Sequence, residues 1–169
     1  DYGGYSIING NEKVIISQER KVYNIPQVFR NNKPSTRYSH ICEITSMKEN
    51  DYFMPKISSI KITKKENIYD NYLRISLPHL KQEIPLLILF KALGCLNDKE
   101  IIYYIIDNDN SKLDNLIIKI LYLSIQESSD INTESEAIEY ISKYINNNSY
   151  TLSEDKKMKY VRENVLKDY

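Results

Sequence analysis

The sequence has no tryptophan, only four glycines and only two cysteines in 169 residues. Two cysteines are too few for a disulfide framework, and Cys42 and Cys95 are not spaced as a metal-binding knuckle. We expect both to be reduced thiols in the core of an intracellular protein. The chain also contains no phosphate loop, dinucleotide fingerprint or nucleophile elbow.

A membrane-spanning run and a net charge are missing as well. The most apolar stretch, 86–93, belongs to a run of about ten residues, whereas a bilayer needs about 20. There is no signal peptide or initiator methionine, so we expect a piece of a longer protein. Basic and acidic residues both number 23, but residues 1–80 carry 12 basic and 8 acidic side chains. Any polyanion contact is therefore expected in the first half.

The front half predicts a small antiparallel sheet. A hairpin is expected where an apolar run at 5–8 meets Asn9-Gly10 and returns at 13–18. Further strands are predicted by alternation at 40–47, 56–63 and 69–77. The segment 19–29 is ambiguous between strand and helix, with Pro26 arguing against a helix interior.

A helix apolar nearly all round is predicted after Pro85, a residue that suits a first turn, and is expected to stop at Gly94. Lys91 is its one polar residue, so the helix should lie at the centre of the core. We expect Leu87, Ile88 and Phe90 to be almost fully buried.

The back half predicts further helices. Asn97 with Glu100 and Thr133 with Glu136 resemble capping boxes, and Ser153 is a candidate N-cap. An apolar stripe marks another helix between them: Leu113, Leu116, Ile117, Ile120, Leu121 and Ser124. The predicted fold class is therefore α+β, with a small antiparallel sheet in the front half and a helical back half.

Two candidate metal groups fail on spacing. Asp107, Asp109 and Asp114 lie in a run that begins like a calcium loop, but the central Gly and terminal Glu are missing. His40 and His79 have no cysteine or carboxylate at ligand spacing and are interpreted as structural or exposed. No metal site and no catalytic residue is predicted.

The remaining candidate surface is basic and interleaved with aromatic residues that could stack on bases. Its cations are Lys13, Arg20, Lys21, Arg30, Lys33 and Arg37, and its aromatics are Tyr23, Phe29 and Tyr38. Phosphate binding there would be independent of sequence and sensitive to salt. On the residues alone, the favoured interpretation is a solvated sheet edge that carries cations against aggregation.

Several long stretches carry a more specific signal. They read GGYSIINGNEKVIISQER from residue 3, NIPQVFR from residue 24, IKITKKENIYDNYLRISLP from residue 60 and LPHLKQEIPLLILFKALGCLNDKEI from residue 77. With the closing KMKYVRENVLKDY, they resemble the second-largest subunit of multisubunit DNA-directed RNA polymerases. The QER ending at 18–20 resembles the eukaryotic, archaeal and viral branch. Together with 26 isoleucines, 17 asparagines and 15 tyrosines, it suggests a large DNA virus as the source.

The resemblance implies a domain organisation and a role. Residues 1–20 would end the protrusion domain, and residues 21–169 would form the lobe, one wall of the DNA cleft and a docking surface. Implied partners are the other polymerase subunits, especially the largest, with DNA, the DNA–RNA hybrid and transcription factors, and no membrane. The family's Mg²⁺ is bound mainly by the largest subunit, so this fragment should hold no cofactor and be non-catalytic alone. The implied location is virion and host cytoplasm for a virus, or the nucleus for a eukaryotic cell.

The resemblance also suggests which residues face nucleic acid. Lys13, Ile16, Ser17 and Gln18 match positions near nascent RNA and the hybrid in bacterial relatives, and Arg20 and Lys21 extend that edge. Lys81 and Gln82 match family positions that suit a structural role equally well. Two alternatives stay open: a free-standing α+β interaction module with no nucleic-acid role, and a domain that binds nucleic acid by itself.

Overall fold

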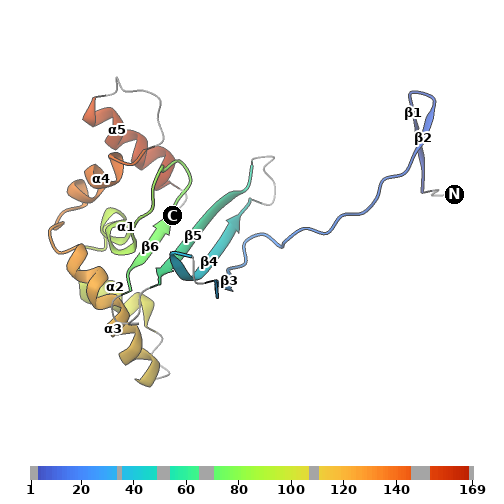
Figure 1. Ribbon diagram of the computed structural model, residues 1–169. Helices are drawn as coiled ribbons and strands as arrows, with labels where there is room; N and C mark the ends of the chain where they lie inside the picture. Colours follow the sequence, from blue (N-terminus) through green and yellow to red (C-terminus); the bar gives the residue numbers. More distant parts are fainter. Residues whose placement is uncertain are drawn as a thin grey trace.

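The computed structural model confirms the α+β class (Figure 1). It describes residues 4–33, 36–48, 54–64, 71–106, 111–145 and 153–167, without the side chains of 111–114 and 116. The Asp-rich run at 107–110, rejected above as a calcium loop, and the stretch at 146–149, expected to end the fourth helix, lie outside these residues. None of the described helices is long and apolar enough to cross a membrane.

The expected hairpin forms, but it is shorter than predicted. Strand β1 (Ser6–Ile8) pairs antiparallel with β2 (Asn11–Lys13). Asn9 and Gly10 join them with φ angles of 54° and 79°, as a two-residue primed turn requires. The predicted strand at 13–18 is wrong, because β2 ends at Lys13 and the chain runs on without regular structure. In Figure 1 this hairpin stands well away from the rest of the chain.

A five-stranded antiparallel sheet follows, in the order β3-β4-β5-β6-β7. Its strands are β3 (Gln27–Arg30), β4 (Tyr38–Ser46), β5 (Lys56–Thr63), β6 (Leu73–Ser76) and β7 (Ile84–Pro85). The predicted strands at 40–47 and 56–63 are confirmed closely, and the one at 69–77 in part. The two-residue strand β7 was not predicted, because it is too short to show alternation.

The helices begin largely where the sequence signals place them. They are α1 (Leu86–Ala92), α2 (Asp98–Ile105), α3 (Ser111–Glu127), α4 (Glu134–Ser142) and α5 (Glu154–Tyr160), which continues as the π-helical turn η2 (Val161–Val165). The capping box of Thr133 and Glu136 is confirmed. Asn97 caps α2 through the N–H of Lys99 rather than through a box with Glu100, and the Ser153 side chain makes no cap hydrogen bond.

Helix α1 lies between two apolar clusters, as an all-round apolar helix requires. One side packs on β6, β7, α4 and η2, while Leu87 on the other side meets Ile101 of α2 and Leu121 of α3. Leu87 and Ile88 are 0% and 1% exposed, which confirms two of the three predicted core residues. Phe90 is only half-buried, and so are Cys42 and Cys95, which corrects the prediction that they are core residues.

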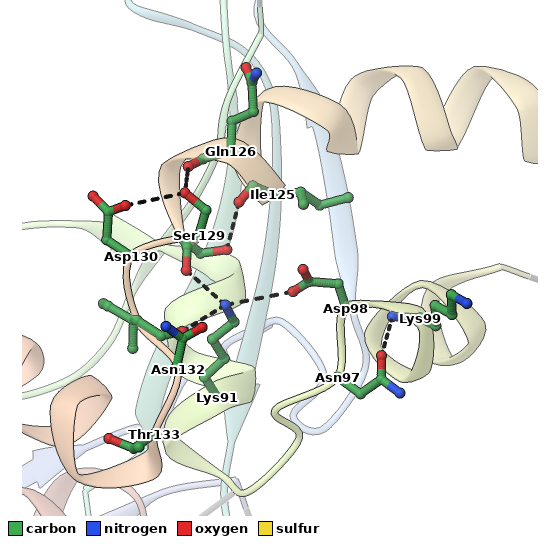
Figure 2. A network of polar contacts seen from close by, with 12 residues as sticks. Lys91, Asn97, Asp98, Lys99, Ile125, Gln126, Ser129, Asp130, Asn132 and Thr133 are labelled. Atoms are coloured by element: carbon green, nitrogen blue, oxygen red, sulfur yellow. Dashed lines mark hydrogen bonds and ion pairs between the residues drawn. The ribbon is translucent and has the colours of Figure 1, made fainter.

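A buried lysine ties α1 to its neighbours (Figure 2). The Lys91 Nζ donates to the carbonyl oxygens of Ser128 at 2.7 Å and Ile131 at 2.9 Å, in the connection between α3 and α4. It also lies 3.6 Å from Asp98 Oδ1 in the first turn of α2. Lys91 is 3% exposed, so its charge is held by groups from two other segments rather than by water.

Truncating the central helix should destabilise the chain strongly. Leu87→Ala should lower the free energy of unfolding by roughly 2 to 5 kcal/mol, because it leaves a cavity between α1, α2 and α3. Urea denaturation followed by circular dichroism measures this difference. Leu93→Ala is the matched control, because that side chain is 41% exposed and should cost far less. Equal losses in the two variants would contradict the central position of α1.

Removing the buried charge should also be costly. Lys91→Met keeps the length of the side chain but leaves the carbonyl oxygens of Ser128 and Ile131 without their donor and the Asp98 carboxylate without its nearby positive charge. We expect a loss of roughly 2 to 4 kcal/mol in urea denaturation. Lys99→Met, at an exposed position of α2, should change stability by about 0.5 kcal/mol or less. If Lys91→Met matches the wild type, the lysine does not tie the helices together.

Candidate nucleic-acid interface

The residues expected to face nucleic acid are all exposed. Lys13 ends β2, while Ile16, Ser17, Gln18, Arg20 and Lys21 lie in the irregular stretch between β2 and β3. Ile16 is 80% exposed, and the apolar side chains of Tyr5, Ile7, Ile8, Val14 and Ile15 beside it are also exposed. The structure therefore leaves these side chains open to a neighbour.

The basic candidates do not form one surface. Lys13 belongs to the distant hairpin, whereas Lys21 reaches β3, where its Nζ lies 4.7 Å from the ring centroid of Phe29. This is the distance expected for a cation over an aromatic face. The predicted stacking partner Phe29 is thus already in contact with a cation of the chain.

A second basic cluster forms at the end of the sheet where β3 turns into β4. Arg30 ends β3 opposite His40 in β4, and the backbone of Lys64 donates to the Arg37 carbonyl oxygen at 2.8 Å. The Lys64 Nζ donates to the Lys33 carbonyl oxygen at 3.1 Å. The sequence analysis did not include Lys64 in the basic surface, because it lies 27 or more residues after Arg37 and Lys33 in the chain. Only the pairing of β4 with β5 brings it next to them.

The middle of the same sheet is electrically balanced. Glu83 accepts a hydrogen bond from Lys61 Nζ at 2.6 Å and another from the Tyr38 hydroxyl, and Lys61 Nζ lies 5.3 Å from the Tyr38 ring centroid. Burial raises the pKa of Glu83, but the bonds from Lys61 and Tyr38 outweigh it and leave that pKa below its ordinary value. Tyr38, predicted as a base-stacking residue, is thus occupied within the sheet.

A shallow hollow between β6 and α3 is also neutralised. The Arg74 side chain donates a hydrogen bond from Nη2 to Glu127 Oε1 at 2.6 Å. Both residues line the hollow together with Tyr72, Leu123 and Gln126. An anion would have to displace the Glu127 carboxylate to bind there. Sequence reasoning missed this pair, because β6 and α3 are far apart in the chain.

The described part of the chain offers no cluster of metal ligands. It contains no group of three or more His, Cys, Asp or Glu side chains that could hold a metal ion. His79 is exposed and meets the ring of Tyr160 edge-on, and His40 contacts the Ser39 hydroxyl.

Comparison with known proteins finds relatives over most of the chain. The family model described as RNA polymerase Rpb2, domain 2, matches residues 22–168. DNA-directed RNA polymerase II subunit RPB2 of Encephalitozoon cuniculi is 39% identical over 143 residues, 85% of this chain and 12% of that protein. Subunit 2 of the Arabidopsis thaliana polymerase II is 33% identical over 99% of the chain and 14% of its own length. Subunit Rpo2 of the archaeon Sulfolobus acidocaldarius is 31% identical over 83% of the chain and 11% of its own length.

The Glu83 network should make stability depend on pH. Glu83→Gln should lower the urea midpoint at about pH 7, because the carboxylate that accepts from Lys61 and Tyr38 is lost. Because the pKa of Glu83 is lowered in the folded state, its carboxylate stabilises the fold at pH values above its ordinary pKa of 4.5. This stabilisation is lost as the pH falls through the folded-state pKa. The difference in urea midpoint between wild type and Glu83→Gln should therefore close below pH 4.5.

The measurement is a set of urea midpoints between about pH 7 and about pH 3. Glu139→Gln, which removes an exposed pair with Lys143, is the control and should shift the midpoint little throughout. A gap for Glu83→Gln that stays constant with pH would contradict the network.

Proposed function

The chain belongs to the family of RNA polymerase Rpb2, domain 2, and on that premise we propose that it forms one wall of the DNA cleft in a DNA-directed RNA polymerase. The wall would also be a docking surface during transcription. The carrying observation is the family match across residues 22–168 on an α+β fold. It supports a part of a second-largest subunit over a free-standing interaction module.

The chain spans only 12 to 14% of the length of its first relatives. Catalytic activity is therefore proposed only for the whole enzyme. Nucleotide transfer by such polymerases uses Mg²⁺, and the described residues do not fit a metal site. We propose that the largest subunit supplies the metal ligands and that this chain alone is non-catalytic.

Residues 1–20 and 21–169 are proposed to belong to different domains, the protrusion and the lobe. The family model begins at residue 22, and the hairpin stands apart from the sheet (Figure 1). The apolar side chains between Tyr5 and Ile16 are exposed, which supports this division. The remainder of a protrusion domain would cover them.

In the assembled enzyme, we propose that Lys13, Ile16, Ser17, Gln18, Arg20 and Lys21 face the DNA or the DNA–RNA hybrid. Their exposure supports the proposal, since phosphate contacts need accessible cations. Transcription factors and other subunits are the proposed partners of the remaining surfaces.

The source is proposed from composition. The abundance of isoleucine, asparagine and tyrosine supports an AT-rich genome, and a large DNA virus stays our proposal. A viral enzyme would occupy the virion and host cytoplasm, whereas a cellular eukaryotic one would occupy the nucleus. The genes beside the one that encodes this chain would decide between the two.

The first test is to purify the full-length parent protein from its native source and identify its partners by mass spectrometry. Recovery of a largest subunit that carries metal-binding aspartates is the expected result. Recovery of a 169-residue protein alone, at its own size, would overturn the proposal in favour of the free-standing module.

Charge reversal should reveal the nucleic-acid contacts. In the assembled enzyme, Lys13→Glu with Arg20→Glu should weaken DNA binding and make it less dependent on salt. Two lost phosphate contacts lower the slope of log affinity against log salt by about 2. Fluorescence anisotropy over a range of salt concentrations measures the slope. Lys156→Glu with Lys157→Glu, on α5, is the charge-matched control, and equal slopes in all three enzymes would contradict the assignment.

A further inference from the structure

Strand β3 presents an open hydrogen-bonding edge. It pairs with β4 on one side, and Asn31 donates to the Ser39 carbonyl oxygen at 2.8 Å just beyond its end. Because antiparallel strands point alternate residues toward the same neighbour, Phe29 also bonds β4, and the N–H and C=O groups of Val28 and Arg30 point outward. Within the described part of the chain, no backbone partner meets those outward groups.

An apolar row leads across the sheet to this edge. Direct cross-strand neighbours run from Ile84 through Ile75, Ile60 and Cys42 to Val28. Exposure rises along the row from 0% at Ile84 and 4% at Ile75 to 37% at Ile60 and 71% at Val28. The helices therefore cover only the β6–β7 end, and the row continues uncovered to the edge (Figure 1).

The charge next to Val28 on the same face is positive. Arg30 lies two residues along β3, so its side chain projects from the same side of the sheet. It forms no ion pair with a described residue, and neither do Lys33 and Arg37 in the same cluster. Glu43 of β4 pairs with Gln27 and so belongs to the opposite face. Glu83 is already held by Lys61 and Tyr38.

We propose that an extended, acidic segment of a partner polypeptide adds to β3 as a sixth strand. Its backbone would pair with the outward groups of Val28 and Arg30. Its side chains would place an apolar residue opposite Val28 and, two positions away, a carboxylate opposite Arg30. Main-chain bonds would supply affinity, and these two side chains would select the segment.

Two features of β3 limit which strand can pair with it. Natural edges are blunted by short strands, by proline or by charged side chains. Strand β3 has four residues and carries the charge of Arg30, so it does not favour every strand. Pro26 lies before the strand begins and Val28 keeps an N–H that can donate, so a strand that neutralises Arg30 can still pair.

The proposal rests on the proposed function for one condition, that the chain works within an assembled polymerase. Recovery of the largest subunit establishes that condition first. Failure of the strand in a verified assembly then counts against this inference alone.

The test compares amide hydrogen exchange in the purified full-length subunit and in the assembled enzyme, with residue-level fragmentation. The amides of Val28 and Arg30 should exchange at least about tenfold more slowly in the assembly, and that of Phe29 should be protected in both. Fast exchange of Val28 and Arg30 in both states would show a solvated edge. Slow exchange in both would show that the same subunit covers it. Either result overturns the proposal.

Two variants sharpen the result. Val28→Pro removes an outward donor without touching the ladder to β4, so protection of the Arg30 amide should fall to the level of the free subunit while that of Phe29 stays. Val22→Pro, at an exposed position before β3, is the matched control and should leave both unchanged. Arg30→Glu keeps the backbone intact and should also release the strand by charge repulsion.

A photo-reactive side chain at Lys33 identifies what lies beside the edge. Crosslinks to a segment of another polypeptide with an apolar residue two positions from an acidic one are expected. Crosslinks to DNA or RNA, with no polypeptide, would overturn the proposal and assign the basic cluster to phosphate contact.

Discussion

The buried ammonium of Lys91 is the constraint on which the helical half of the structure depends. A charge on the most apolar helix must find polar partners, because leaving it unpaired in the core would cost several kcal/mol. It finds them in the carbonyl oxygens of Ser128 and Ile131. The connection between α3 and α4 and the start of α2 must therefore lie on the same side of α1. Asp98 Oδ1 is buried without a hydrogen bond, so it attracts the ammonium only as a charge.

Other polar links hold the helices to the sheet at its β6–β7 end. The hydroxyl of Ser124 accepts from the backbone N–H of Leu73 at 3.1 Å, which joins α3 to β6. The backbone N–H of Lys81 donates to the Tyr144 carbonyl oxygen at 2.8 Å, which joins the turn before β7 to the end of α4. Lys81 thus contributes through its backbone while its side chain stays exposed. Both of these links lie at the β6–β7 end of the sheet, whereas Val28 at the β3 edge is 71% exposed.

The sequence predicted what local chemistry decides. Asn9-Gly10 can adopt positive φ cheaply, so the hairpin turn follows from two residues, and Thr133 with Glu136 determines the start of α4 in the same local way. The strand predicted at 13–18 failed because alternation alone does not make a strand: β1 begins only at Ser6, which pairs with Lys13, and the described residues before Ser6 do not continue the ladder. For the site, the sequence found Arg30, Lys33 and Arg37, but not Lys64 or the pairing of Lys61 with Glu83. These depend on strand register, which a list of charges does not contain.

The distribution of paired and unpaired charges separates scaffold from contact surface. Cations that touch the helices or the middle of the sheet, such as Lys61, Arg74 and Lys91, each have a carboxylate within 4 Å. Arg30, Lys33 and Arg37, at the open end, have none in the described chain. Desolvating an unpaired cation is unfavourable, so a partner that covers this end must bring negative charge of its own. Apolar area near Val28 alone would favour any strand, whereas the unpaired Arg30 beside it restricts the choice to an acidic one.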